Sequence, residues 1–121
     1  MSTTATPRIT EPPRIGALAT LPLFHKLVGR RVVLAGDGEG AVWKAELLAS
    51  AGADLHIYAP RAAGRFRTLA ARSGLAITLH ERAWTPVDLA GAALVVAEAE
   101  SDAEAEAFVA AGHAAGAVVN V

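Results

Sequence analysis

Apolar residues along this chain alternate between runs with the period of a β-strand and stretches with the period of a helix. Five short runs rich in β-branched and aliphatic residues predict strands, at 30–36, 54–59, 76–81, 92–98 and 117–121. The first run (RRVVLAG) and the fourth (AALVVAE) are almost continuously apolar, as in strands that are covered on both faces. Helical periodicity between the runs predicts helices at about 40–51, 61–73 and 101–115, with a short helical piece near 86–90.

The order of these elements predicts an α/β fold with a doubly wound parallel sheet. Right-handed crossovers between successive strands would give a single Rossmann-like sheet of about five strands in the order 3-2-1-4-5. Ligands of such sheets bind at the carboxyl ends of the strands where the order reverses, here the runs at 30–36 and 92–98. We expect one domain over residues 21–121, preceded by a flexible, proline-containing lead-in at 1–20.

Two of the predicted helices show in their sequences how they lie on the sheet. Ala41, Ala45 and Leu48 share one face of the helix at 40–51, so this face of small and aliphatic residues is expected to pack on the strands. Ser101 followed by Glu104 predicts a capping box at the start of the last helix. The acidic residues around that helix start are then most simply a solvated first turn that complements the helix dipole.

Composition narrows the classes of function. The 121 residues contain no cysteine, which excludes disulfides, thiolate metal sites and cysteine nucleophiles and fits the cytoplasm. The net charge is −1, from 11 basic and 12 acidic residues, so no overall field attracts nucleic acid or an anionic membrane surface. No apolar run reaches the ~20 residues of a membrane span. We therefore expect neither nucleic acid nor a membrane as a partner.

A glycine-rich turn follows the first predicted strand. Gly36, Gly38 and Ala41 form the pattern G-x-G-x-x-A between a strand and a helix, which is the context of a dinucleotide fingerprint. Such a turn brings backbone close to a pyrophosphate at a helix N-terminus. Asp37 and Glu39 place carboxylates beside that position, and the second strand ends in Tyr-Ala-Pro without the acid that holds a ribose. The turn is thus either a nucleotide site or a glycine-shaped corner without a ligand.

Several segments together resemble one family. They are LPLF at 21–24, the glycine turn with Lys44 behind it, the Ala-Pro that ends the second strand, DLAGAALVVAEAESD at 88–102 and the terminal VVNV. From Leu21 to Val121 the chain resembles the NAD-binding domain of the precorrin-2 dehydrogenase and siroheme synthase family. The resemblance implies NAD as cofactor and the tetrapyrrole precorrin-2 as substrate, oxidised to sirohydrochlorin. Some members also insert ferrous iron.

The resemblance also implies which residues contact the cofactor. By position these are Gly36, Gly38, Glu39, Gly40, Ala41, Pro60, Arg61, Ala97, Glu98 and Ala99. The family's catalytic aspartate is expected just beyond Val121, followed by a helical dimerisation region, so no catalytic residue and no metal ligand is assigned within the chain. We expect turnover, and a possible homodimer, only in a longer form.

The chain departs from the family pattern at Asp37, Gly40, Ala99 and Ala105. These changes add a carboxylate or remove a polar contact near the cofactor, so we expect weak NAD binding. Three interpretations stay open: an NAD-dependent dehydrogenase domain, a non-catalytic module that binds a nucleotide or tetrapyrrole, and a Rossmann-like regulator without cofactor.

The histidines, a cluster of arginines and the two tryptophans can each be explained by a structural role. The four histidines are not spaced as a metal pair and are expected in structural or surface roles: His25, His56, His80 and His113. The basic cluster is either a solvated helix face or a docking surface for tetrapyrrole carboxylates: Arg61, Arg65, Arg67, Arg72 and Arg82. Trp84 is expected in the core, whereas Trp43 lies on the outward face of its helix.

Overall fold

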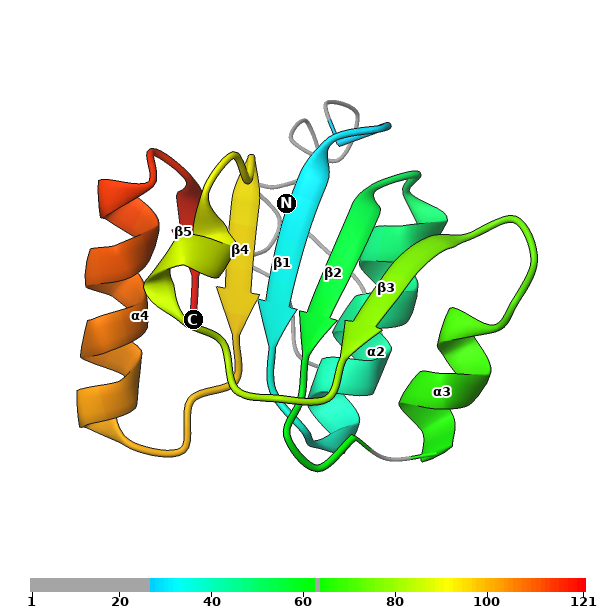
Figure 1. Ribbon diagram of the computed structural model, residues 1–121, viewed down its shortest axis with the longest axis horizontal. Helices are drawn as coiled ribbons and strands as arrows, with labels where there is room; N and C mark the ends of the chain where they lie inside the picture. Colours follow the sequence, from blue (N-terminus) through cyan, green and yellow to red (C-terminus); the bar gives the residue numbers. More distant parts are fainter. Residues whose placement is uncertain (1–26, 63) are drawn as a thin grey trace, which may run out of the picture.

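The computed structural model contains one sheet of five parallel strands in the order β3-β2-β1-β4-β5 (Figure 1). The strands are β1 (Arg31–Ala35), β2 (Asp54–Tyr58), β3 (Ala76–His80), β4 (Leu94–Ala97) and β5 (Val118–Asn120). The structure describes residues 27–62 and 64–121, so the predicted lead-in, the LPLF segment and His25 lie outside the described residues. The predicted fold class and strand order are confirmed.

The helices lie close to their predicted positions: α2 (Glu39–Ser50), α3 (Gly64–Ala70), η2 (Pro86–Leu89) and α4 (Asp102–Ala114). The second helix is shorter than the predicted 61–73. Arg61 precedes the helix, and its backbone N–H donates to the Asp37 carboxylate (2.9 Å). Past its end, Gly74 takes a left-handed conformation (φ +88°) that turns the chain toward β3.

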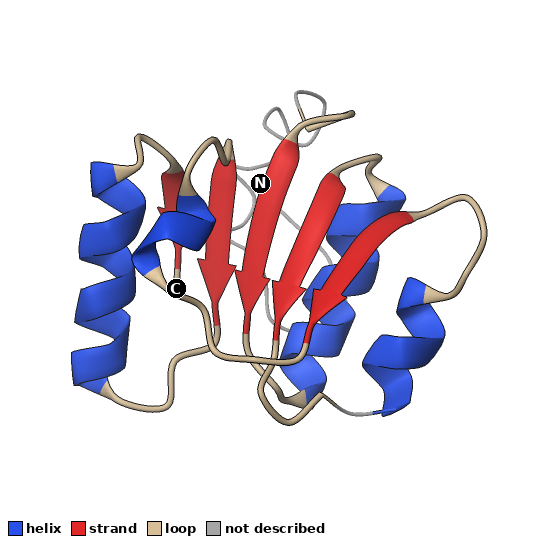
Figure 2. Cartoon of the chain, in the orientation of Figure 1, coloured by secondary structure: helices blue, strands red, loops and turns tan. Residues whose placement is uncertain are grey.

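Both faces of the sheet are buried, as the apolar runs predict. Val32 and Leu34 of β1 point into a core formed with α2 and α3, and Val33 points into a second core with η2 and α4. In the shared view of Figure 1 and Figure 2, α2 passes behind the strands and η2 lies in front of β4. This arrangement explains why β1 and β4 carry almost no polar residues: each lies between two neighbouring strands and two helical layers.

The predicted helix faces are confirmed, with one difference at a cap. Ala41, Ala45 and Leu48 are completely buried against the sheet. At the start of α4, the Ser101 hydroxyl accepts a hydrogen bond from the Glu104 N–H (3.1 Å). The Glu104 carboxylate, however, accepts from the N–H of Glu100 (2.8 Å) and not from that of Ser101. The capping box is therefore displaced by one residue, which also ties down the loop after β4.

Within residues 27–62 and 64–121, no helix combines the length and the apolar character that crossing a membrane would require.

Candidate functional site

The chain leaves β1 for α2 and β4 for α4 at the same edge of the sheet, where the arrowheads of Figure 1 lie. Because β1 and β4 are adjacent and their following helices cover opposite faces, this edge is the topological switch point of the fold. Ligands of open α/β sheets bind in the crevice at this point. The predicted crevice is therefore in place, and its walls are the loops that follow β1, β2 and β4.

The glycine turn between β1 and α2 is as tight as its sequence predicts. Gly36 has φ +155°, and a Cβ there would lie 3.3 Å from the Ala41 Cβ and 3.2 Å from the Glu98 Cβ. Its N–H donates to the carbonyl of Tyr58 (3.1 Å), which extends the β1–β2 pairing into the turn. The carbonyl of Gly38 then accepts from the N–H of Ala41 (3.1 Å) and begins the helix. A side chain at position 36 would strain the backbone and crowd both Ala41 and Glu98.

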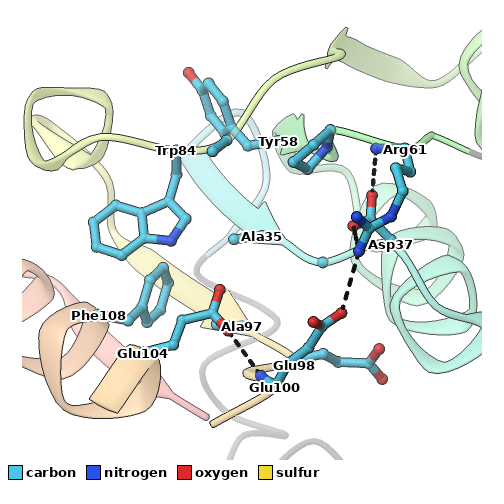
Figure 3. A pocket seen from close by; sticks show the side chains of 13 residues that line it. Ala35, Asp37, Tyr58, Arg61, Trp84, Ala97, Glu98, Glu100, Glu104 and Phe108 are labelled. Carbon is cyan, nitrogen blue, oxygen red and sulfur yellow. Dashed lines mark hydrogen bonds and ion pairs between the residues drawn. The ribbon is translucent and has the colours of Figure 1, made fainter.

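Two hollows lie on either side of this turn. The first, about 150 Å³, has the aromatic side chains of Tyr58, Trp84 and Phe108 in its lining (Figure 3). The second, about 620 Å³, includes Gly38 and Lys44 in its lining. Ligand sites typically measure about 300–1,000 Å³, so the second hollow alone falls within that range. Four residues line both hollows and form the partition between them: Asp37, Ala97, Glu98 and Glu100.

Asp37 holds two of the loops together. One of its carboxylate oxygens accepts the N–H of Arg61 (2.9 Å), and the other lies 3.9 Å from the Arg61 guanidinium (Figure 3). The same guanidinium lies 3.7 Å from the carboxylate of Glu100. Arg61 is 75% exposed, so these ion pairs are screened by solvent, whereas the hydrogen bond fixes the loop. Asp37, whose carboxylate counts against a nucleotide site in the sequence, thus joins the loop after β1 to the loop after β2.

Glu98 lies across the glycine turn. A Cβ at Gly38 would be 3.3 Å from Glu98 Oε1, and a Cβ at Gly40 would overlap Glu98 Oε2. The backbone of the turn forms a cradle without side chains at Gly38 and Gly40, which fits the close approach of a phosphate group. The side chain of Glu98 occupies that cradle.

The predicted site residues fall into two groups. Seven of them line one or both hollows: Gly36, Gly38, Pro60, Arg61, Ala97, Glu98 and Ala99. The other three line neither. Ala41 is completely buried and packs beneath the turn, Glu39 pairs with Arg65 (2.7 Å) on the surface, and Gly40 lies against the carboxylate of Glu98. Ala41 therefore supports the turn through packing.

Sequence reasoning missed the aromatic wall of the first hollow. Trp84, expected in the core, is partly exposed and meets Phe108 edge to face, with ring centroids 5.1 Å apart. The ring of Tyr58 stacks on that of His80, with ring centroids 4.3 Å apart. Tyr58 ends β2 and Phe108 lies on the sheet-facing side of α4, so the rule that sites form at carboxyl ends could have found them. No pattern in the sequence fixes the path of the loop that carries Trp84.

Two histidines predicted to be separate are brought together by strand pairing. His56 Nδ1 and His80 Nε2 are 3.1 Å apart, and the Asp54 carboxylate lies 3.7 Å from the other ring nitrogen of His56. Burial lowers the pKa of both histidines. Charge repulsion from Arg31 lowers the pKa of His56 further, and charge repulsion from Arg82 does the same for His80. Among the residues that the structure describes, no group of three or more potential ligands could hold a metal ion.

The basic cluster is neutralised within the chain. Each of its arginines has a carboxylate partner: Arg61 with Asp37 and Glu100, Arg65 with Glu39, Arg67 with Glu81, Arg72 with Glu46, and Arg82 with Asp88. This pairing favours the solvated helix face over the docking surface.

Comparisons with known proteins agree with this geometry. A model of the family described as "Putative NAD(P)-binding" matches residues 23–121. Siroheme synthase of Ectopseudomonas mendocina is 41% identical over 101 residues, which cover 84% of this chain and 21% of the relative. Siroheme synthase of Pseudomonas putida is 47% identical over 77 residues, or 64% of this chain and 16% of the relative. The chain thus spans about a fifth of the length of these curated relatives.

A solved structure supports the fold. SirC, a precorrin-2 dehydrogenase, superposes with a TM-score of 0.65 at 21% sequence identity, covering 78% of this chain and 45% of that one.

Proposed function

The chain belongs to the NAD(P)-binding domain family of siroheme synthases and precorrin-2 dehydrogenases, and from this premise we propose that it binds NAD across the glycine turn. The observation that carries this proposal is the position of the turn, at the switch point between β1 and β4 with a hollow on each side. An extended dinucleotide has two nucleoside ends joined by a pyrophosphate. It therefore matches two hollows joined by a phosphate cradle.

Each part of the site has a distinct task in this proposal. The glycines bring the backbone and the N-terminus of α2 to the pyrophosphate, whose charge the helix dipole favours. The aromatic wall of Tyr58, Trp84 and Phe108 offers an apolar surface for a planar ring and keeps water from it. Asp37, which lines both hollows, holds the Arg61 loop in position beside the first hollow.

We further propose that the full protein oxidises precorrin-2 to sirohydrochlorin, as the family resemblance implies; the names siroheme synthase and precorrin-2 dehydrogenase support this proposal. Bound NAD⁺ would supply the hydride acceptor. In this proposal the described residues position the cofactor, and proton transfer, substrate enclosure, any homodimer contact and any insertion of ferrous iron belong to a longer form. The aspartate that the family resemblance places after the VNV segment is our candidate for the proton transfer.

A calorimetric titration with NAD tests the binding site. Gly38 is the N-cap of α2 and lines the second hollow, so Gly38→Trp should abolish binding by filling the space beside the turn. Ala107→Trp is the matched control, because Ala107 is exposed on α4 and lines neither hollow; it should bind NAD as the wild type does. Undiminished binding by Gly38→Trp would contradict the site.

A non-catalytic nucleotide-binding module is the second candidate. Three of the four residues that line both hollows carry carboxylates, Asp37, Glu98 and Glu100, and these oppose an anionic cofactor. The two candidates separate when NADH formation from precorrin-2 is measured for this chain and for a longer form. Turnover only by the longer form supports the dehydrogenase, and NAD binding without turnover in either form supports the module.

A further inference from the structure

We infer that Glu98 is a specificity-determining residue of the site: its carboxylate takes the place of the cofactor pyrophosphate in the glycine cradle, and NAD must displace it to bind. This inference rests on the proposed function, since it concerns how strongly the same site holds NAD. The sequence predicts weak NAD binding from several departures together, and this inference assigns the main part of that effect to Glu98.

The position of the side chain is the first argument. Both carboxylate oxygens of Glu98 lie over the turn, with Oε1 near Gly38 and Oε2 against Gly40. The Cβ of Glu98 also fills the space beside Gly36. One side chain therefore approaches all three glycines, in the volume that their missing side chains leave free. A phosphate group and this carboxylate cannot occupy that volume together.

The two hollows give a second, independent argument. Glu98 lines both of them and stands in the partition that separates them. A dinucleotide that places its ends in the two hollows must cross this partition with its pyrophosphate. Glu98 and Glu100 are the largest side chains of this partition. If the Glu98 side chain turned away, the partition would lose one of these two at the point where the ligand crosses. Glu98 is thus one of the four residues that stand between the two hollows, and it is the one that also reaches the glycine turn.

The backbone of Glu98 is fixed, so only its side chain can move. Its N–H donates to the carbonyl of Ala35 (3.0 Å), which continues the β1–β4 pairing by one residue. Rotation about the side-chain bonds is the remaining way to open the cradle. The carboxylate would then move toward solvent near Glu100, which is exposed and already pairs with Arg61 (3.7 Å). Both the free-energy cost of this rotation and the repulsion between the Glu98 carboxylate and the pyrophosphate therefore weaken NAD binding.

Two variants separate charge from volume. Glu98→Gln keeps the size of the side chain and removes its charge, and Glu98→Ala removes both. The Glu98 carboxylate and the cofactor pyrophosphate are both negative and would repel each other at the protein surface. We therefore expect Glu98→Gln to tighten NAD binding about tenfold. Glu98→Ala should tighten it further, because it also removes the side chain that fills the cradle. The control is Glu106→Gln, an exposed carboxylate of α4 that lines neither hollow, because it changes the net charge equally. It should leave the affinity for NAD unchanged.

Adenosine tests whether the effect acts on the phosphates. It carries the base and ribose of the cofactor without the pyrophosphate, so its affinity should be equal for the wild type and Glu98→Gln. A gain for adenosine as large as that for NAD would overturn the assignment of Glu98 to the phosphate position.

Backbone amide spectra of the ligand-free protein give a readout that needs no cofactor. If the carboxylate lies in the cradle, Glu98→Gln should shift the amide resonances of Gly38 and Gly40, while Glu106→Gln should not. Unshifted resonances would overturn the inference, as would equal NAD affinity of the wild type, Glu98→Gln and Glu98→Ala. Failure of all variants to bind NAD, with the amide shifts present, would instead contradict the proposed function and leave Glu98 as a cradle-filling residue without a cofactor to exclude.

Discussion

Asp88 shows how much one side chain organises in the connection between β3 and β4. Its carboxylate accepts hydrogen bonds from both terminal nitrogens of the Arg82 guanidinium (2.9 Å each) and from the N–H and hydroxyl of Thr85 (2.7 and 2.9 Å). These donors, Arg82 foremost, hold the pKa of Asp88 well below its usual value of 3.8. Asp88 therefore fixes both the start of η2 and the loop that carries Trp84.

Asp88→Asn should lower the free energy of unfolding at neutral pH by about 1–2 kcal/mol, because it removes a charged cap and the partner of Arg82. The folded pKa lies below the unfolded one, so this stabilisation is present above pH 3.8 and is lost as the pH falls through the folded value. Urea titrations between neutral and acidic pH should show the two proteins converging below pH 3.8. Equal stability of the two proteins at neutral pH would contradict this role, and Glu106→Gln serves as the neutral control.

At the scale of single residues, the sequence predicted contacts between neighbours along the chain and did not predict contacts between distant loops. The pattern around Gly36 and Ala41 predicted the turn, because both the tight backbone and the close packing depend on residues near in sequence. The hydrogen bond from Arg61 to Asp37 joins residues 24 positions apart, and the carboxylate of Glu98 reaches the turn from another strand. Such contacts depend on how loops meet in space, which no local pattern encodes.

At the scale of elements, α4 lies unusually close to the sheet. A Cβ at Gly112 would lie 2.5 Å from Val119 Cγ2 and 2.9 Å from Val95 Cγ2, so the absence of a side chain sets the distance between helix and strands. The start of α4 follows β4 directly and carries part of the lining of both hollows. Packing at Gly112 thus helps to position the site.

Gly112→Ala should destabilise the protein by about 1–3 kcal/mol through overpacking, less the gain of up to about 1 kcal/mol that alanine brings to a helix. Gly64→Ala is the matched control, because nothing lies within 4 Å of a Cβ at the start of α3. That variant should be neutral or more stable by about 0.4–1 kcal/mol. Thermal unfolding of both variants measures the difference, and a Gly112→Ala protein as stable as Gly64→Ala would refute the close packing.

The sequence predicted most of the strands and helices. The strands followed from apolar runs and α2 from its small-residue face, since burial on both sides of a sheet imposes these patterns. The start of α3 at Gly64 and the cap of α4 were not predicted. At α4 the Glu104 carboxylate reaches past Ser101 to the N–H of Glu100, and this side-chain hydrogen bond decides the cap.

At the scale of the whole molecule, the strand order places the site. Because the chain turns back after β3 and adds β4 on the other side of β1, the ends of β1 and β4 form one crevice. The sequence predicted this crevice through topology, but it could not predict that the Glu98 side chain lies against the glycine turn. The connection from β3 to β4 contains only the short η2, and the ring of His80 stacks on those of both His56 and Tyr58.

The central claim is that NAD binds at the carboxyl edge between β1 and β4. The most direct test is to titrate the protein with NAD and to follow the backbone amide resonances. We predict saturable shifts in the glycine turn and in the loop after β4, at residues 36–40 and 97–101, while the opposite edge at Gly52, Gly91 and Gly116 stays unchanged. Saturable shifts confined to another surface, or unchanged resonances in the turn at saturating NAD, would contradict the claim.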